Sequence, residues 1–321
     1  MENSTIIPAP LSLAGLAWRQ ITRDDLAALV ELADACFLAD GGLHFLFESD
    51  SISGRFFPAA PGATIGAFAP DGHLAACAAA HLGEGPGSQR AMIVGHVRPD
   101  QRGRGIGTYL MRWGQVQAQS LLAGSANNQP VMQITTESLT ESAHRLYQAH
   151  GFEIVAESLV MGRDNDLPLP DCPLPPGVTL TNWQPNLADQ FFQAYDAAFR
   201  ERPGFPGWTT AAEWVDSWTN DHFRPEWSPL ARADNVSLGL LMATSNPPHG
   251  FVMQVGVVPT QRRRGLCSAL IVETMRRMQA AGAVSTQLTV HVDNPGAIRA
   301  YGKLGFETIG RRARYERIAQ R

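Results

Sequence analysis

The chain carries the same glycine-bearing loop twice. The first copy runs Arg102-Gly103-Arg104-Gly105-Ile106-Gly107 and the second runs Arg262-Arg263-Arg264-Gly265-Leu266-Cys267. Each copy follows an apolar stretch that ends in Val-X-Pro. Each is followed later by the pattern Tyr-X-X-X-Gly-Phe, which begins at Tyr147 and at Tyr301. Gly105 and Gly265 are 160 residues apart, and the two tyrosines are 154 residues apart. A repeat of this length is the size of a domain, so the sequence predicts two domains of one kind.

Each loop has the features of an anion-binding site. An apolar run leads into a tight turn, and the turn leads into a segment with helical periodicity. The first turn of a helix leaves about four backbone N–H groups without internal partners, and their dipoles add up to a partial positive charge. Glycine lets the backbone approach a ligand closely, and the neighbouring arginines raise the local positive potential. The pattern therefore predicts that each loop binds an anionic group such as a phosphate.

The organisation of the chain also favours two domains. A length of 321 residues suggests about two domains. Residues 164–177 contain five prolines, and prolines at this density resist both helix and central strand. We therefore expect an N-terminal domain at 13–163, an extended linker at 164–177 and a C-terminal domain at 178–321.

Composition argues against several classes of protein. The net charge of −4 gives no basic footprint for a nucleic-acid partner. The four cysteines are scattered without a Cys-X-X-Cys pair, so we expect neither a metal site nor a disulfide framework. The start of the chain lacks a signal-peptide pattern, and no apolar run approaches about 18 residues. We expect a cytoplasmic protein with no membrane partner.

Strands and helices alternate in the same order in both halves. Strands are expected at 17–21, 63–68, 73–81, 91–97, 131–136 and 152–160, and again at 178–182, 238–243, 252–257 and 287–292. Helices are expected at 24–40, 106–122 and 141–149, and again at 187–199, 210–218, 266–281 and 296–303. This alternation predicts an α/β fold in which helices flank a mixed sheet.

Both loops resemble the main signature of the GNAT superfamily of acyl-CoA-dependent N-acetyltransferases, Arg/Gln-X-X-Gly-X-Gly/Ala after a Val-X-Pro strand end. The first loop matches it fully, and the second differs only at Cys267. The segment from Val290 to Tyr301 is similar to the family's second signature, in which an asparagine and a tyrosine flank the sulfur end of the cofactor. The first half keeps Tyr147 but has Thr140 where Asn294 aligns. The tandem arrangement is similar to that of the mycothiol synthases.

The resemblance implies two tandem domains, each with a splayed sheet, and acetyl-CoA as the acyl donor. It implies that pantetheine pairs with the backbone near Val97 and Val257 and that the loop amides hold the pyrophosphate. The candidate cofactor-binding residues in the first half are His96, Val97, Arg102, Gly103, Arg104, Gly105, Ile106, Gly107 and Thr108. Those in the second half are Val257, Val258, Arg262, Arg263, Arg264, Gly265, Leu266, Cys267, Ser268 and Asn294.

The expected reaction is direct acetyl transfer to the amine of a small molecule. Tyr301 is the first candidate to donate a proton or hydrogen bond to the departing thiolate, and Tyr147 is the second. A general base is expected to help because an alkylammonium has a pKa near 10. The candidates His291, Glu137 and His96 stay open. Four acids of the second half are expected to be surface charges: Glu213, Asp216, Asp221 and Glu226.

Two alternatives remain at this point. The chain could instead be an acetyl-CoA-binding module in which one or both domains no longer catalyse, because Thr140 and Cys267 each depart from the family pattern. A cluster of tryptophans at 208, 214, 218 and 227 is interpreted either as a hydrophobic cluster or as a wall of the acceptor site. A nucleotide-binding P-loop is excluded, since neither loop ends in Gly-Lys-Ser/Thr. We place the chemistry mainly in the C-terminal domain, where Asn294 and Tyr301 occur together.

Overall fold

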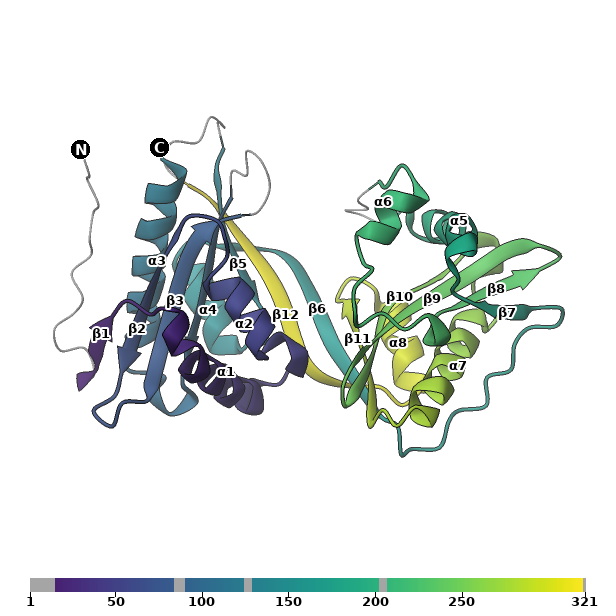
Figure 1. Ribbon diagram of the computed structural model, residues 1–321, viewed down its shortest axis with the longest axis horizontal. Coiled ribbons are helices and arrows are strands. Elements are labelled where there is room, and N and C mark those ends of the chain that lie inside the picture. Colours follow the sequence, from purple (N-terminus) through teal and green to yellow (C-terminus); the bar gives the residue numbers. More distant parts are fainter. Residues whose placement is uncertain (1–14, 84–89, 124–128, 202–206, 320–321) are drawn as a thin grey trace. The chain divides into compact units, whose positions relative to one another are not determined.

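The computed structural model describes residues 15–83, 90–123, 129–201 and 207–319. It divides into two compact units, one of Met1–Leu159 with Ile309–Arg321 and one of Val160–Thr308. Each unit is a mixed sheet with helices against it (Figure 1). The predicted α/β class is therefore confirmed. Residues 168–175, inside the predicted linker, are described as coil.

The sheet of the first unit contains β1 (Ala17–Arg19), β2 (Gly62–Phe68), β3 (Leu74–Leu82), β4 (Arg90–Val97), β5 (Val131–Thr136) and β12 (Glu307–Ile318), side by side in that order. All neighbouring pairs in this series are antiparallel except β4 and β5, which run parallel. The first part of β6 (Glu153–Asp164) follows β12. The helices are α1 (Leu26–Asp40), α2 (Ser49–Phe56), α3 (Ile106–Leu122) and α4 (Glu141–Ala149).

Strand β3 explains how helices cover both faces of this sheet. Five of its nine residues are alanine, and the first seven are buried. Cys77 and Ala79 pack in one cluster with residues of α1 and α2, whereas Ala76 and Ala78 pack with residues of α3. Successive side chains of a strand point to opposite faces. Small side chains at these positions let helices lie close to both sides of the central strand.

The second unit repeats the arrangement. Its strands are β7 (Thr179–Asn182), β8 (Pro229–Ala233), β9 (Val236–Asn246), β10 (His249–Val257) and β11 (Ser285–His291), in that order, with β6 residues beside β11. Its helices are α5 (Ala188–Phe199), α6 (Ala211–Asp216), α7 (Leu266–Ala280) and α8 (Pro295–Lys303). Strands β10 and β11 pair in parallel, whereas β7 with β8, β8 with β9 and β9 with β10 pair antiparallel.

The parallel pair splays apart in both units. Pairing of β4 with β5 runs from Arg90 and Val131 to Ile93 and Ile134, although β4 continues to Val97. Pairing of β10 with β11 ends in the same way at Val252 and Leu288. The register of β10 against β9 also shifts between Val252 and Gln254, which marks a bulge. The splay implied by the family resemblance is thus present twice.

Strand β12 completes the first unit although it ends the chain. Six of its residues, Ala313 to Ile318, pair with β5. Tyr315 is fully buried and packs in one hydrophobic cluster with Met132 and Phe152. The segment that follows α1 contacts this strand, because the N–H of Gly42 donates a hydrogen bond to the carbonyl of Ile309 at 3.2 Å. The core of the first unit therefore depends on residues from the far end of the sequence.

The tryptophans of the second unit form a hydrophobic core. Trp214 and Trp218 are buried and pack with Trp183 and Phe191 of the same cluster. The ring centroids of Trp183 and Trp218 lie 5.1 Å apart in an edge-to-face arrangement, a favoured geometry for aromatic pairs. Trp208 is partly buried against this cluster. These contacts support the hydrophobic-cluster interpretation.

Candidate functional site

Both loops turn into their helices through a left-handed glycine. Gly105 caps α3 with φ 81°, and Gly265 caps α7 with φ 82°. A side chain would strain this backbone, so glycine is favoured at both positions. The first helical turn begins directly after each glycine and presents its free N–H groups there. The local geometry is that of a phosphate-binding helix N-terminus in each unit.

The two loops differ two residues before these caps. Gly103 has φ 76°, whereas the residue at the same place in the second loop, Arg263, has φ 63°. A non-glycine residue in the left-handed region costs about 1–2 kcal/mol. The second loop thus keeps the backbone path of the first at a cost in strain, and its extra arginine adds positive charge next to the helix N-terminus.

The loops also differ at the second helical residue. At Gly107 a side chain would come within 3.3 Å of Leu146 on α4. Cys267 occupies the corresponding place on α7 and is mostly buried, and this burial raises the pKa of its thiol to about 11. The thiol is therefore neutral at physiological pH and acts there as a small apolar side chain.

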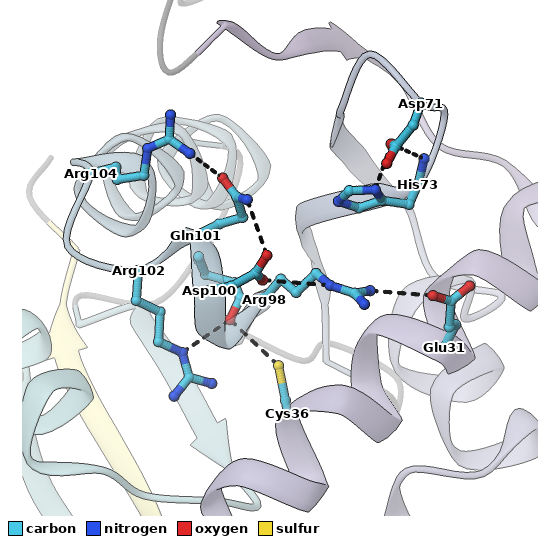
Figure 2. A network of polar contacts seen from close by, with 10 residues as sticks. Glu31, Cys36, Asp71, His73, Arg98, Asp100, Gln101, Arg102 and Arg104 are labelled. Carbon is cyan, nitrogen blue, oxygen red and sulfur yellow. Dashed lines mark hydrogen bonds and ion pairs between the residues drawn. The ribbon is translucent and has the colours of Figure 1, made fainter.

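Arg102 fixes the end of β4 to the end of α1. Its Nε donates to the carbonyl of Val97 at 3.1 Å, and its two Nη atoms donate to both carboxylate oxygens of Asp40 at 2.7 Å. The Sγ of Cys36 approaches the same Val97 carbonyl at 3.5 Å, so two donors from separate elements meet at one oxygen (Figure 2). The guanidinium of Arg102 is thus engaged in holding the strand end rather than directed at the loop amides.

Arg262 performs the same task in the second unit. Its Nε donates to the carbonyl of Val257 at 3.2 Å, and Nη2 donates to the carbonyl of Ala198 near the end of α5 at 2.9 Å. The two signature arginines therefore both donate a hydrogen bond to the carbonyl of the last residue of the splayed strand. Sequence reasoning assigned them to the cofactor, and their contacts add a role in shaping the splay.

A second polar network borders the first loop. Arg98 lies between Glu31 of α1 and Asp100, at 3.3 and 3.5 Å (Figure 2). Gln101 accepts a hydrogen bond from Arg104 and donates one to Asp100 at 3.2 Å. These contacts orient the side chains that lead into the loop, and they give Arg104 a fixed position beside the helix N-terminus.

A cavity of about 400 Å³ in the first unit connects the loop with the splayed strands. Eight of the predicted residues line it: His96, Val97, Arg102, Gly103, Gly105, Gly107, Thr108 and Tyr147. Ile106 belongs instead to the core under α3. The sequence analysis missed the lining residues Cys36, Asp40, Phe47, Arg55 and Ser138. They lie far from the loop in sequence, in segments with no motif of their own.

Tyr147 is partly buried against the core of the first unit and lines the cavity. Its ring packs against Tyr315 with centroids 5.0 Å apart, and the Tyr315 hydroxyl and Nδ1 of His144 are hydrogen-bonded at 2.6 Å. Burial raises the pKa of Tyr147 to about 12, although a hydrogen bond with Thr136 opposes the shift. A tyrosine with a raised pKa is a weaker acid, so Tyr147 gives up its proton to a thiolate less readily than an unperturbed tyrosine would.

The corresponding tyrosine of the second unit, Tyr301, is mostly buried on α8, with its ring centroid 6.1 Å from that of Phe306. Asn294 caps this helix because its Oδ1 accepts from the N–H of Ala297 at 3.1 Å. Thr140 caps α4 in the same way, accepting from Ala143 at 3.2 Å. The exchange of asparagine for threonine therefore keeps the helix cap. Thr140 lacks the side-chain NH₂ group that Asn294 has in the second unit.

The candidate bases have distinct surroundings. The carboxylate of Glu137 accepts a hydrogen bond from Nε of Arg312 on β12. Burial lowers the pKa of His96 to about 3, and the charges of Arg55 and Arg102 act in the same direction. His291 is one-third exposed, with Nδ1 3.5 Å from the carboxylate of Asp293. The side chains of Glu213, Asp216, Asp221 and Glu226 lie at exposed positions, as expected for surface charges.

Within the described ranges, no three or more His, Cys, Asp or Glu side chains gather as a metal site would require. In the same part of the chain, no helix combines the length and apolar character needed to cross a bilayer.

Two parts of the chain match family models. Residues 63–154 match the model described as acetyltransferase (GNAT) domain, and residues 188–306 match the acetyltransferase (GNAT) family. The chain belongs to the GNAT family of acetyltransferases. The predicted family, the tandem arrangement and the class of enzyme are thereby confirmed.

Similar proteins agree with this assignment. The chain is 29% identical to the mycothiol acetyltransferase of Frankia casuarinae over 94% of its own length and 98% of the relative's. It is 31% identical to the mycothiol acetyltransferase of Nocardia farcinica, with 74% and 77% covered. A solved GCN5-related N-acetyltransferase from Sphaerobacter thermophilus superposes with a TM-score of 0.74 at 25% identity over 95% of this chain and 96% of that one.

A second solved structure shares the fold. The tandem GNAT protein from the clavulanic acid biosynthesis pathway superposes with a TM-score of 0.64 at 16% identity, covering 95% of this chain and 99% of that one. The tandem GNAT architecture is thus common to chains whose sequences have diverged widely.

Proposed function

We propose that this GNAT protein transfers the acetyl group of acetyl-CoA directly to the amine of a small molecule, mainly in its C-terminal unit. The observation that carries the proposal is the repeated pairing of a left-handed glycine cap with a splayed parallel strand pair. The cap offers amides to a pyrophosphate, and the splay leaves backbone groups of β4 and β10 for a pantetheine arm. The relatives named mycothiol acetyltransferase support a small-molecule acceptor.

The residues of the second unit would divide the work as follows. The backbone from Arg262 to Ser268 would hold the diphosphate at the start of α7. Residues near Val257 would align the thioester and supply an N–H to the oxygen that becomes negative during attack. Asn294 and Tyr301 would flank the sulfur. Bound acetyl-CoA supplies the activated acetyl group, and the attacking amine must reach the site as the neutral base.

Tyr301 would serve mainly as a hydrogen-bond donor to the departing thiolate. A thiol titrates near 8.5 and an unperturbed tyrosine near 10, so complete proton transfer is uphill by about 2 kcal/mol. At Tyr147, where burial raises the pKa to about 12, the same transfer is uphill by about 5 kcal/mol. The raised pKa of Tyr147 and the occurrence of Asn294 together with Tyr301 support placing the chemistry in the second unit, while the first unit would bind a second cofactor molecule.

The test is release of free CoA thiol from acetyl-CoA with a panel of small primary amines. Tyr301→Phe is expected to lower kcat by about 10²-fold or more, in the range typical of a lost hydrogen-bond donor to a developing negative charge. Tyr147→Phe is expected to retain most activity. Tyr109→Phe is the matched control, because Tyr109 packs against Trp18 outside the cavity lining.

Two results would count against this proposal. Equal activity in Tyr301→Phe and the wild type would remove the tyrosine from the mechanism. Tight acetyl-CoA binding without thiol release for any amine would favour the alternative, an acetyl-CoA-binding module. Cys267 in the place of Gly107 is the feature of the second unit that speaks for that alternative.

A further inference from the structure

A partly buried cation, Arg55, lines the cavity of the first unit. Arg55 projects from α2, and its Nε donates to the carbonyl of Ser51 at 3.3 Å while Nη2 donates to the carbonyl of Leu46. The guanidinium carbon lies 5.8 Å from the ring centroid of Phe47, which lines the same cavity. Burial lowers the pKa of Arg55, and an arginine so shifted still keeps its charge at neutral pH. Both backbone acceptors are neutral, so they leave this charge uncompensated.

The acids near Arg55 are already engaged. Glu137 attracts Arg55 electrostatically, but its carboxylate accepts a hydrogen bond from Arg312. Asp40, which also lines the cavity, is held by both Nη atoms of Arg102. The charged groups concerned are Arg55, Arg102 and Arg312 together with Asp40 and Glu137. Among the described residues these groups leave one net positive charge, and a buried charge without a full counter-charge is costly.

A second polar group that lines this cavity, His96, has a ring nitrogen whose hydrogen-bonding capacity is unused within the described ranges. His96 stacks on Phe56 with ring centroids 6.0 Å apart and lies 6.2 Å from Phe47. Its Nε2 is buried and has no hydrogen-bond partner among the described residues. Buried polar atoms are normally paired. Arg55 and His96 both lie against Phe47, so one small molecule can reach both.

We infer that the first unit binds a small molecule through a carboxylate held by Arg55, with His96 hydrogen-bonded to a second polar group of that molecule. Arginine suits this task because its planar donor fork matches the two oxygens of a carboxylate. The aromatic ring of Phe47 would cover the apolar part of the ligand. Binding here needs no acetyl transfer, so the inference stands or falls separately from the proposed reaction.

The experiment is isothermal titration of the full chain, saturated with CoA, at about pH 7.5. The probes are β-alanine and glutarate, each compared with the analogue in which carboxamide replaces carboxylate and the negative charge is lost. We expect saturable binding of at least one carboxylate, with its amide weaker by about tenfold or more, since hydrogen bonds to charged groups are the stronger ones. Equal binding of acid and amide, or no saturation by any carboxylate up to about 10 mM, would overturn the inference.

Substitutions of Arg55 then test its role in binding the carboxylate. Arg55→Met is expected to abolish the preference for the carboxylate, and Arg55→Lys to retain part of it. Arg276→Met is the matched control, because Arg276 lies on the exposed side of α7 and pairs with Glu273. The comparison of acid with amide uses the wild type, so it remains decisive even where Arg55→Met fails to fold. An unchanged preference in a folded Arg55→Met protein would refute the role of Arg55.

The carboxylate could also arrive on the acyl group of the cofactor. Competition between succinyl-CoA and acetyl-CoA distinguishes this source from a free ligand. Tighter binding of succinyl-CoA that is lost in Arg55→Met would support the carboxylate site with the acyl chain as its carrier. Equal binding of the two thioesters, combined with saturable β-alanine or glutarate, would assign the site to a free molecule.

Discussion

Replacing His96 with glutamine should make the first unit less sensitive to acid. The imidazole of His96 is buried between Phe47 and Phe56, and Nε2 has no partner in the described part of the chain. A proton on this ring would place a charge in an apolar site close to Arg55. The folded unit therefore resists protonation of His96, whereas the unfolded chain does not.

The expected effect follows from the two pKa values. Burial lowers the pKa of His96 to about 3 in the folded unit, against about 6.5 for an unperturbed histidine. Between these values the unfolded chain binds a proton that the folded unit does not. Above about pH 6.5 the ring is neutral in both states, so His96 does not reduce the free energy of unfolding. As the pH falls below this value, protonation of the unfolded chain lowers the free energy of unfolding. At about 1.4 kcal/mol per pH unit, the loss between pH 7 and pH 5 is roughly 2 kcal/mol.

Hydrogen exchange in urea, read by mass spectrometry on peptides of β4, measures this loss within the first unit. The wild type and His96→Gln are each compared at pH 7, 6 and 5, so that any constant cost of the substitution cancels. We expect the wild type to lose roughly 2 kcal/mol more than the variant. His222→Gln, at an exposed position of the second unit, should behave as the wild type. Equal acid sensitivity in wild type and His96→Gln would refute the reasoning.

Two substitutions and one truncation test further features of the backbone. Arg263→Gly should raise the free energy of unfolding of the second unit by about 1 kcal/mol in urea, because it removes the strain of a left-handed non-glycine residue; a lower stability would contradict this. Gly41→Ala should destabilise the first unit far more than Gly72→Ala, since both have positive φ but only at Gly41 would the new Cβ overlap the carbonyl of Ile309; similar melting temperatures would argue against the close approach. A chain that ends at Thr308 should lose the protection of the first unit against limited proteolysis, because β12 is absent; retained protection would show that the unit folds without it.

The features that sequence reasoning found are those that depend on local backbone chemistry. The glycine caps at Gly105 and Gly265 are recognisable because only glycine occupies the left-handed region without strain. The strand that precedes each loop and the helix that follows it are also local, since both show in the periodicity of apolar residues. The four acids of the second unit were also correctly interpreted as surface charges, because charged side chains are mostly exposed whatever their neighbours.

The partners of the loop residues were not predictable. Asp40, which holds Arg102, lies 62 residues earlier in the chain. Arg312, which binds Glu137, lies 175 residues later. No spacing rule joins residues so far apart, because their contact exists only once the strands between them have paired. The acid sensitivity of His96 and the excess charge at Arg55 both depend on such contacts.

The amino-acid sequence alone was enough to show the duplication, the α/β class, the two loops with glycine helix caps and the family. These follow from short-range patterns that repeat within each half. The folded chain was needed to show that residues 309–318 join the sheet of the first unit and carry Arg312 and Tyr315 into it. The alternation of apolar and polar residues in a strand does not specify which sheet the strand joins. The packing of Ala313 and Tyr315 against Met132 and Phe152 selects one edge, and that choice exists only in three dimensions.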